Sequence, residues 1–220
     1  MLSFFKRKTY PKYFKKYLNS FKNKKPKSIN KTRFVVFDTE TTGLDTNTDR
    51  ILSIGAIAIN NGIIDVADSF EIYLKQDQFN ADTVEIHGIL KEGNIEKISE
   101  EKAIEHFINY LKNAVLIAHH AAFDVKMINS ILKRMNLQKL KNKSIDTGIL
   151  YKKLEGKQND HFSLDKLCEE FNIPLHDRHT ASGDAYITAI LFLKIISKLK
   201  QQRLLHYSDL FRTNNSKGLL

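Results

Sequence analysis

The sequence has a single cysteine and no long apolar run, and both shortages limit what the chain can be. Cys168 cannot form a disulfide within the chain, so we expect a reducing compartment such as the cytoplasm. It falls in an apolar stripe of helical spacing with Leu164, Leu167 and Phe171, which favours a buried core thiol over a nucleophile. No stretch approaches the ~18 consecutive apolar residues of a transmembrane helix. We also expect no signal peptide, because charges interrupt the apolar residues of the N-terminus.

Acidic residues are absent from residues 1–31, which carry the whole positive excess of the chain. This segment holds eleven of the 35 lysines and arginines, while residues 32–220 hold the other 24 and all 25 acidic residues. The net charge of +10 therefore describes the tail and not the nearly neutral body. After Pro11, apolar residues recur at helical spacing, which predicts an amphipathic helix with lysines on its other face, followed by a linker at 22–27. The apolar positions are Tyr10, Tyr13, Phe14, Tyr17, Leu18 and Phe21.

Apolar patterning in the body predicts one α/β domain over residues 32–200, followed by a C-terminal extension at 201–220. The expected strands are residues 33–38, 51–60, 63–74, 114–118 and about 144–145. The expected helices are residues 99–112, 122–136, 147–155, 163–171 and 182–200. Asn61-Gly62 is a strong hairpin signal between the second and third strands. Antiparallel strands followed by alternating strands and helices predict a mixed five-stranded sheet flanked by helices.

Two acidic residues, Asp38 and Glu40, stand at the end of the first predicted strand. The four apolar residues before them indicate a strand buried on both faces. Side chains two positions apart in a strand point the same way, so both carboxylates should emerge together at the edge of the sheet. A divalent cation relieves their repulsion best, since hard oxygen ligands suit Mg²⁺ or Mn²⁺. A strand that runs into an acidic, solvent-facing turn explains this pair alone equally well.

Asp124 and Asp184 fall near the starts of two predicted helices. The helix dipole favours an acid in the first turn, so each could serve only as capping chemistry, with Ser182 as the N-cap of the second helix. His179 precedes Asp184 by five residues, about 500° of helical rotation, so the two cannot share a helical face. We therefore expect His179 on the preceding loop, where an imidazole can take a proton from water near neutral pH.

Three motifs together resemble the DEDD exonucleases of the histidine subtype, a family that includes the exonuclease (epsilon) subunit of bacterial DNA polymerase III and its stand-alone relatives. The motifs are Phe37-Asp38-Thr39-Glu40-Thr41-Thr42-Gly43, His119-His120-Ala121-Ala122-Phe123-Asp124 and His179-x-x-x-x-Asp184. The resemblance covers about residues 32–197 and implies a ribonuclease H-like fold. It also implies His179 as the general base and two divalent ions, Mg²⁺ or Mn²⁺. The implied metal ligands are Asp38, Glu40, Asp124 and Asp184.

The resemblance also suggests residues that contact substrate. Thr41, Thr42 and Leu44 lie where the family grips the terminal nucleotide with backbone N–H groups and an apolar wedge. His87 lies in a short segment that resembles one beside the family's substrate groove. A helix C-terminus capped by Gly88 explains that segment equally well.

Four further residues in or near these motifs have less specific roles. His120 replaces the family's usual asparagine, so we expect metal ligation to survive, while a contact to the terminal nucleotide is left open. An extra metal site at His119 and His120 is a disfavoured alternative. Phe123 is expected in the core rather than as a stacking platform, and Asp146 as a helix N-cap rather than a ligand.

The resemblance implies a metal-dependent 3′–5′ exonuclease that releases nucleoside 5′-monophosphates from single-stranded or frayed 3′ ends. DNA is the expected substrate, and proofreading or repair the expected context. An enzyme that trims RNA, such as ribonuclease T or an oligoribonuclease, shares these motifs, because the groups differ in how they treat the 2′-OH. A catalytically silent nucleic-acid-binding or polymerase-tethering module is an alternative of another class, which the complete set of ligands and base argues against.

The expected partners are single-stranded DNA 3′ ends, or RNA ends, and a replicative polymerase subunit. The tail could add another. Its basic and aromatic residues suit stacking on unpaired bases with phosphate neutralisation. The same helix also suits peripheral contact with an anionic membrane, or could fold back on the body. Binding of nucleic acid or a partner protein is the interpretation that we favour.

Overall fold

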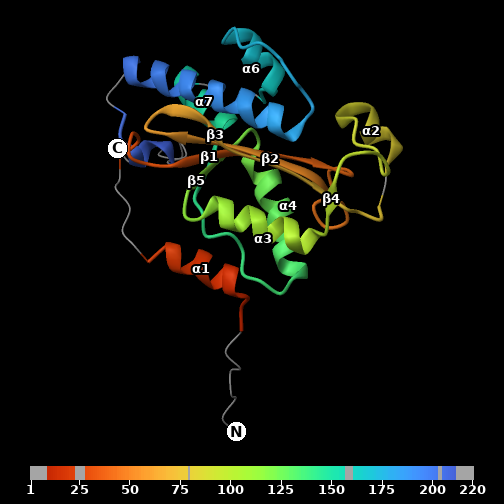
Figure 1. Cartoon of the computed structure of the whole chain (residues 1–220). Coiled ribbons are helices and arrows are strands. Elements are labelled where there is room, and N and C mark those ends of the chain that lie inside the picture. The colour runs from red at the N-terminus through yellow and green to blue at the C-terminus, as the bar shows by residue number, and fades with distance from the viewer. Residues whose placement is uncertain (1–8, 23–27, 79, 157–160, 203–204, 212–220) are drawn as a thin grey trace, which may run out of the picture.

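A six-stranded mixed sheet runs through the middle of the molecule, in the order β4-β3-β2-β1-β5-β6 (Figure 1). The computed structural model describes residues 9–22, 28–78, 80–156, 161–202 and 205–211. The strands are β1 (Phe34–Thr41), β2 (Ile51–Asn60), β3 (Ile63–Leu74), β4 (Lys97–Ile98), β5 (Val115–Ala118) and β6 (Ser144–Asp146). The predicted mixed sheet is confirmed with one strand more, because the two-residue β4 is too short to show a periodicity.

The connections of the sheet follow from local sequence. β1, β2 and β3 pair antiparallel, and Asn61 and Gly62 turn β2 into β3 with φ values of 54° and 77°, as a tight hairpin requires. β5 pairs parallel to β1, and β6 parallel to β5. The short apolar run of β5 is buried at every position, as expected for a central parallel strand.

Helices cover both faces of the sheet, with α7 on one face and α3 and α4 on the other (Figure 1). The helical elements are α1 (Lys12–Ser20), α2 (Ala81–His87), α3 (Glu100–Leu111), α4 (Ala121–Arg134), α5 (Thr147–Glu155), α6 (Leu164–Glu170), α7 (Ala181–Gln202) and the 3₁₀ helix η1 (Tyr207–Leu210). Asp146 caps α5 as predicted, and Ser99 caps α3. Cys168 is a buried, free thiol in α6. None of the described helices is long and apolar enough to span a membrane.

The tail helix α1 folds back on the body. Phe14 and Tyr17 are buried in the core beneath α3, and the Tyr17 hydroxyl donates to Asn142 Oδ1 at 2.6 Å. Lys15 and Lys16 point outward. The alternative that we ranked lower is therefore the one that the structure adopts, and the apolar face of α1 is covered by protein. The proposed linker lies largely outside the described residues, since 23–27 are not among them.

Candidate active site

Strand β1 carries Asp38 and Glu40 to the centre of the sheet. The strand continues to Thr41, beyond the predicted end at residue 38, so both acids lie within it and not after it. Strand alternation places their side chains on the same face as Phe34 and Val36, which is the face that α7 covers. The two carboxylates are therefore half-buried on this face and do not lie on an open acidic turn.

Helix α7 brings Asp184 to the same place because β2 has a glycine opposite Asp38. Asp38 pairs with Gly55, where a Cβ would lie 2.1 Å from backbone atoms of both Ala181 and Ser182. The start of α7 thus rests directly on the backbone of β2. The sequence analysis missed Gly55, although an isolated glycine within a strand is a known sign of close backbone approach.

The start of α7 also differs from the sequence-based expectation. Ser182 was expected as the N-cap, but α7 begins at Ala181, and the Thr180 hydroxyl accepts a hydrogen bond from the N–H of Gly183. Ser182 instead donates to Glu71 Oε1 at 2.5 Å. Ser182 therefore ties the first turn of α7 to β3, which fixes the helix that carries Asp184.

Asp38, Glu40 and Asp184 form a three-carboxylate cluster, with one oxygen of each within 4.8 Å of the others. Burial, followed by the charges of Asp124, Asp184 and Glu40, raises the pKa of Asp38 well above its ordinary value. Burial and the charge of Asp184 raise the pKa of Glu40 to about 7. Oδ1 of Asp184 is buried without a hydrogen-bond partner in the described structure. An oxygen-only cluster with this unsatisfied acceptor fits a hard divalent cation.

Asp124 reaches the cluster from the opposite face of the sheet. It lies in the first turn of α4, and the Thr39 hydroxyl donates to its Oδ1 at 2.7 Å. Burial raises the pKa of Asp124 to about 7, although the bond from Thr39 lowers it. Asp124 is close enough to act on the pKa of Asp38, yet it stands outside the three-carboxylate cluster. The structure thus groups three of the four predicted ligands and places the fourth beside them.

Arg178 is a site residue that the sequence analysis missed. Its guanidinium forms an ion pair with Asp184 through Nη1 and grips Asp165 through Nε at 2.7 Å and Nη2 at 3.0 Å. This positive charge lowers the pKa values of Asp38, Glu40 and Asp184, against the larger effect of burial. Its position directly before His179 was the only signal, and a charged residue on a loop is too common to be informative.

His179 lies on the loop before α7, as predicted. It is exposed, and its φ of 63° is in the left-handed region. Both its charge and its backbone hydrogen bond act on Asp184, and each lowers the pKa of that carboxyl. The imidazole is therefore beside the carboxylate cluster but open to solvent.

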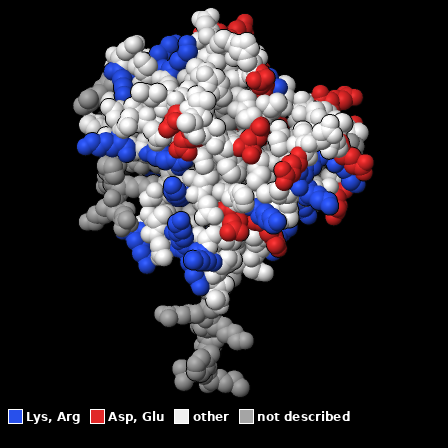
Figure 2. All heavy atoms as spheres, in the orientation of Figure 1, with Lys and Arg blue, Asp and Glu red and all other residues white. Residues whose placement is uncertain are grey.

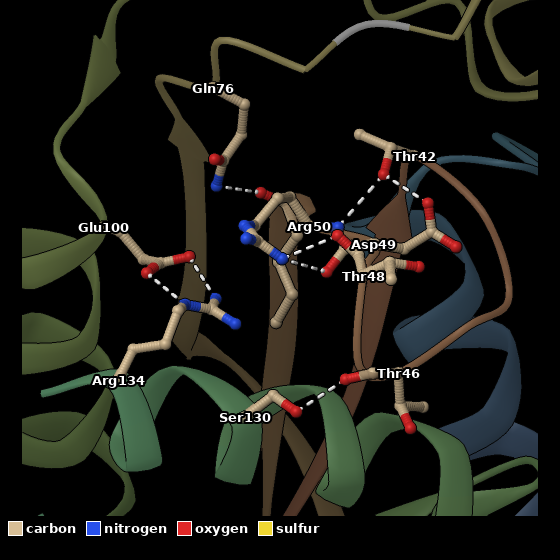
Figure 3. Close-up of polar contacts among 10 residues, drawn as sticks. Thr42, Thr46, Thr48, Asp49, Arg50, Gln76, Glu100, Ser130 and Arg134 are labelled. Carbon is tan, nitrogen blue, oxygen red and sulfur yellow. Dashed lines mark hydrogen bonds and ion pairs between the residues drawn. The ribbon is translucent and has the colours of Figure 1, made fainter. Parts of the chain in front are cut away.

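Three of the predicted substrate contacts lie at the end of β1 and in the loop that follows it, and Figure 3 shows one of them, Thr42. Thr41 Oγ1 donates to the carbonyl of Gly43, and Thr42 Oγ1 donates to Asp49 at 2.8 Å. The N–H of Thr42 is bonded to Arg50 O, so in this conformation it is not free to bind a nucleotide. Leu44 is 84% exposed at the tip of the loop, as an apolar wedge would be.

Histidines and one aromatic ring occupy the remaining predicted positions. His87 is buried at the end of α2, and Gly88 caps that helix at a φ of 67°, so the capping interpretation is confirmed. His119 uses both ring nitrogens, toward Thr147 Oγ1 and Phe162 O, which removes it from an extra metal site. The ring of His120 stacks on that of His161, with the ring centroids 4.3 Å apart. Phe123 is half-buried and packs against the core beneath α4.

Solved structures of exonucleases share this fold. A complex of Exonuclease X with 5′ overhanging duplex DNA aligns with a TM-score of 0.63 at 22% identity, over 81% of this chain and 97% of that one. The nuclease domain of 3'hExo, a DEDDh family member bound to rAMP, aligns with a TM-score of 0.66 at 13% identity, over 77% and 94%. E. coli Exonuclease I in complex with a dT13 oligonucleotide aligns with a TM-score of 0.66 at 19% identity, over 78% of this chain and 42% of that one. The fold and the carboxylate cluster together define a ribonuclease H-like domain with a candidate divalent-metal site.

Sequence comparison narrows this class to a family. The family model described as Exonuclease (RNase_T) matches residues 35–192, and the chain belongs to this family, in the DEDD class of 3′–5′ exonucleases. DNA polymerase III PolC-type of Thermotoga petrophila is 32% identical over 175 residues, and that of Caldanaerobacter subterraneus subsp. tengcongensis is 36% identical over 169. The matches cover 79% and 76% of this chain, which spans only 12% of each relative.

Proposed function

We propose that this chain is a metal-dependent 3′–5′ exonuclease that releases nucleoside 5′-monophosphates from single-stranded or frayed 3′ ends. The observation that carries the proposal is the cluster of half-buried Asp38 and Glu40 with buried Asp184, with Asp124 on its other side and His179 at its open edge. A silent binding module would not need to hold acidic groups together under such mutual repulsion. Family membership supports the same reading.

The carboxylates are the proposed ligands of two divalent cations, Mg²⁺ or Mn²⁺. Asp38 would serve both ions, Glu40 and Asp184 would complete one site, and Asp124 would serve the other directly or through water. When bound, such ions neutralise charge on the phosphate and the leaving oxygen and lower the pKa of the attacking water. Thr39 orients Asp124 by its hydrogen bond, and Ser182 keeps α7 in register with the sheet.

His179 is the proposed general base. Its imidazole would accept a proton from the water that attacks the terminal phosphorus, and the bond from phosphorus to the 3′ oxygen of the preceding nucleotide would break. The products are a nucleoside 5′-monophosphate and a strand one residue shorter with a 3′-OH. Leu44 would pack against the terminal base, since it is the exposed apolar residue on the loop beside the acids.

DNA is the proposed substrate, and proofreading or repair in the cytoplasm the proposed context. The relatives at 32% and 36% identity are PolC-type DNA polymerases, which supports DNA and a replicative polymerase partner. The neighbour with bound rAMP keeps RNA as the competing substrate. The discriminating feature is how the terminal-nucleotide pocket treats a 2′-OH.

Digestion of matched 5′-labelled DNA and RNA strands tests the proposal. With Mg²⁺ or Mn²⁺ we expect ladders that shorten by single nucleotides from the 3′ end, faster on DNA, with no product in EDTA. A circular DNA strand of the same sequence is the control and should resist, because it has no end. Faster digestion of RNA would assign the chain to RNA trimming, and a folded protein inert on both strands would indicate the silent module.

A further inference from the structure

A groove lined almost entirely by polar side chains lies on the outer side of α4. Its volume is about 570 Å³, and it is bounded by Thr46 and Asn47 of the loop after β1, by α4, and by the segment 136–139. The lining includes three lysines, three asparagines and a single apolar residue, Leu137, and none of the described residues that line it is acidic. This composition suits a flexible, hydrated anion and not an apolar ligand.

The lysines of the groove, Lys126, Lys133 and Lys139, are available for a ligand. All three are exposed, and none takes part in an ion pair within the described part of the chain. Arg134, next to Lys133, is by contrast bound to Glu100 at 2.6 Å (Figure 3). The lysines that line the groove therefore form no ion pair among the described residues, whereas Arg134, which lies outside it, does.

The walls of the groove are fixed to one another. Ser130 Oγ donates to the carbonyl of Thr46 at 2.6 Å, which ties the loop after β1 to α4 (Figure 3). Within that loop, Asp49 accepts from Thr42 and from the N–H of Asp45. A preorganised surface loses less conformational entropy when it binds a ligand.

The groove face of α4 begins beside the active site. Phe123, Lys126, Ser130 and Lys133 follow one another at spacings of three or four residues, so they lie along one face of the helix. Phe123 directly precedes the candidate ligand Asp124. From Phe123 to Lys133 the helix rises about 15 Å, enough for roughly four phosphates at ~3.4 Å per nucleotide along a strand.

The positive charge of the groove is a local feature. Residues 32–220 hold 24 basic and 25 acidic residues, and the face in Figure 2 shows both signs interspersed (Figure 2). Attraction of a polyanion by the net charge of the body is therefore weak. A lining with one sign of charge identifies where such a polyanion would be held.

We infer that this groove binds the phosphodiester backbone of the substrate strand, several nucleotides from the 3′ end that occupies the active site. The inference rests on the proposed function, since it assigns the strand's path away from that site. Lys126, Lys133 and Lys139 each neutralise a phosphate, while the asparagines and Ser130 offer hydrogen bonds that do not depend on base identity. The groove therefore adds affinity for length and not for sequence.

The test compares the triple variant K126Q/K133Q/K139Q of the full chain with the matched control K166Q/K198Q/K200Q, which removes three exposed lysines from α6 and α7. Fluorescence anisotropy with a labelled 15-nucleotide dT strand and a trinucleotide is recorded over a range of salt, with Ca²⁺ as the divalent ion and strand integrity checked on gels. Thermal melts confirm that both variants fold.

The salt slope is the slope of the logarithm of the binding constant for the 15-mer against the logarithm of the salt concentration. We expect its magnitude to fall by about 2 in the groove variant, at ~0.7 per lost phosphate contact. Its affinity for the 15-mer should fall at least about tenfold at low salt, with a much smaller loss for the trinucleotide. The control should keep the parental slope. Equal salt slopes in the groove variant and the control would overturn the inference. Full retention of affinity for the 15-mer would also overturn it and would indicate that the groove binds another anion, such as an acidic protein. Strand binding needs no hydrolysis, so the two proposals fail separately. If only the proposed function fails, the parent protein digests no strand, while the groove variant still shows a smaller salt slope than the parent.

Discussion

The carboxylates of the candidate site are held together although burial and mutual repulsion disfavour their charged forms. The pKa values of Asp38, Glu40, Asp124 and Asp184 are all raised, with burial as the largest cause in each case. Arg178 opposes the rise at Asp38, Glu40 and Asp184. Because these groups reduce the stability of the metal-free protein, a role in binding cations explains them better than a role in folding.

Glu40→Gln should stabilise the metal-free protein at high pH. The pKa of Glu40 rises from 4.5 to about 7 on folding, so its stabilising contribution is complete below pH 4.5 and is lost as the pH rises through 7. In EDTA at pH 8 we expect the free energy of unfolding to increase by about 1–3 kcal/mol, with little change at pH 4.5. Urea unfolding at both pH values measures this, and the exposed Glu85→Gln is the control. A stabilisation independent of pH would contradict the assignment.

His179→Ala should lower turnover by roughly 10²–10⁴-fold, the usual contribution of a general base. Divalent-cation affinity, measured by calorimetry, should be retained because the imidazole is exposed and stands outside the carboxylate cluster. A collapse of metal affinity together with turnover would make His179 a ligand and would refute its role as the base.

Among the elements, α7 and β2 determine where the acids meet. The glycine in β2 lets the first turn of α7 rest on the sheet, and the Thr180 cap and the bond from Ser182 to Glu71 fix that turn. The position of Asp184 therefore depends on a backbone contact with β2, together with the hydrogen bonds of the neighbouring Thr180 and Ser182.

Gly55→Ala should displace the first turn of α7. The added methyl would overlap the backbone of Ala181 and Ser182, and overpacking of this kind costs typically ~1–3 kcal/mol. We expect a lower melting temperature and weaker Mg²⁺ binding in the variant, since Asp184 moves with the turn. Melts with and without Mg²⁺ measure both effects. An unchanged Mg²⁺-dependent shift would show that the cluster does not depend on this contact.

The tail helix should behave as part of the core. Phe14 is fully buried, so Phe14→Ala should destabilise the protein by about 3–5 kcal/mol, whereas the exposed Lys15→Ala on the same helix should stay within ~0.5 kcal/mol. Urea unfolding of the two variants measures the difference. Equal stabilities would mean that α1 does not pack on the body in solution.

The sequence predicted local features well and long-range contacts poorly. Strand alternation placed Asp38 and Glu40 on one face, and Asn61-Gly62 marked the hairpin, because each depends on adjacent residues only. The packing of α1 depends on Tyr17 meeting Asn142, 125 positions away, and no periodicity encodes that contact. The ion pair of Arg178 with Asp165 likewise requires knowledge of how the loop before α7 meets the first turn of α6.

At the scale of the whole molecule, the site lies where both layers of helices meet the sheet. Asp38, Glu40 and Asp184 belong to the side of α7, and Asp124 to the side of α4, so the acids approach from both faces of β1. The two hydrophobic cores, which share β1, thus support the two halves of the site. A large-to-small substitution in the core on either side of the sheet should weaken metal binding even where the domain stays folded.

The central claim is that this carboxylate cluster hydrolyses phosphodiesters from the 3′ end. Its most direct test is digestion of a 5′-labelled DNA strand in H₂¹⁸O with Mg²⁺, by the parent and by Asp38→Asn, with mass spectrometry of the released nucleotide. We predict nucleoside 5′-monophosphate with one ¹⁸O in its phosphate from the parent, and less than about a hundredth of that rate from a folded Asp38→Asn, because the proposed ligand of both ions is lost. Internal cleavage, 3′-phosphate products or substantial activity in the variant would contradict the account.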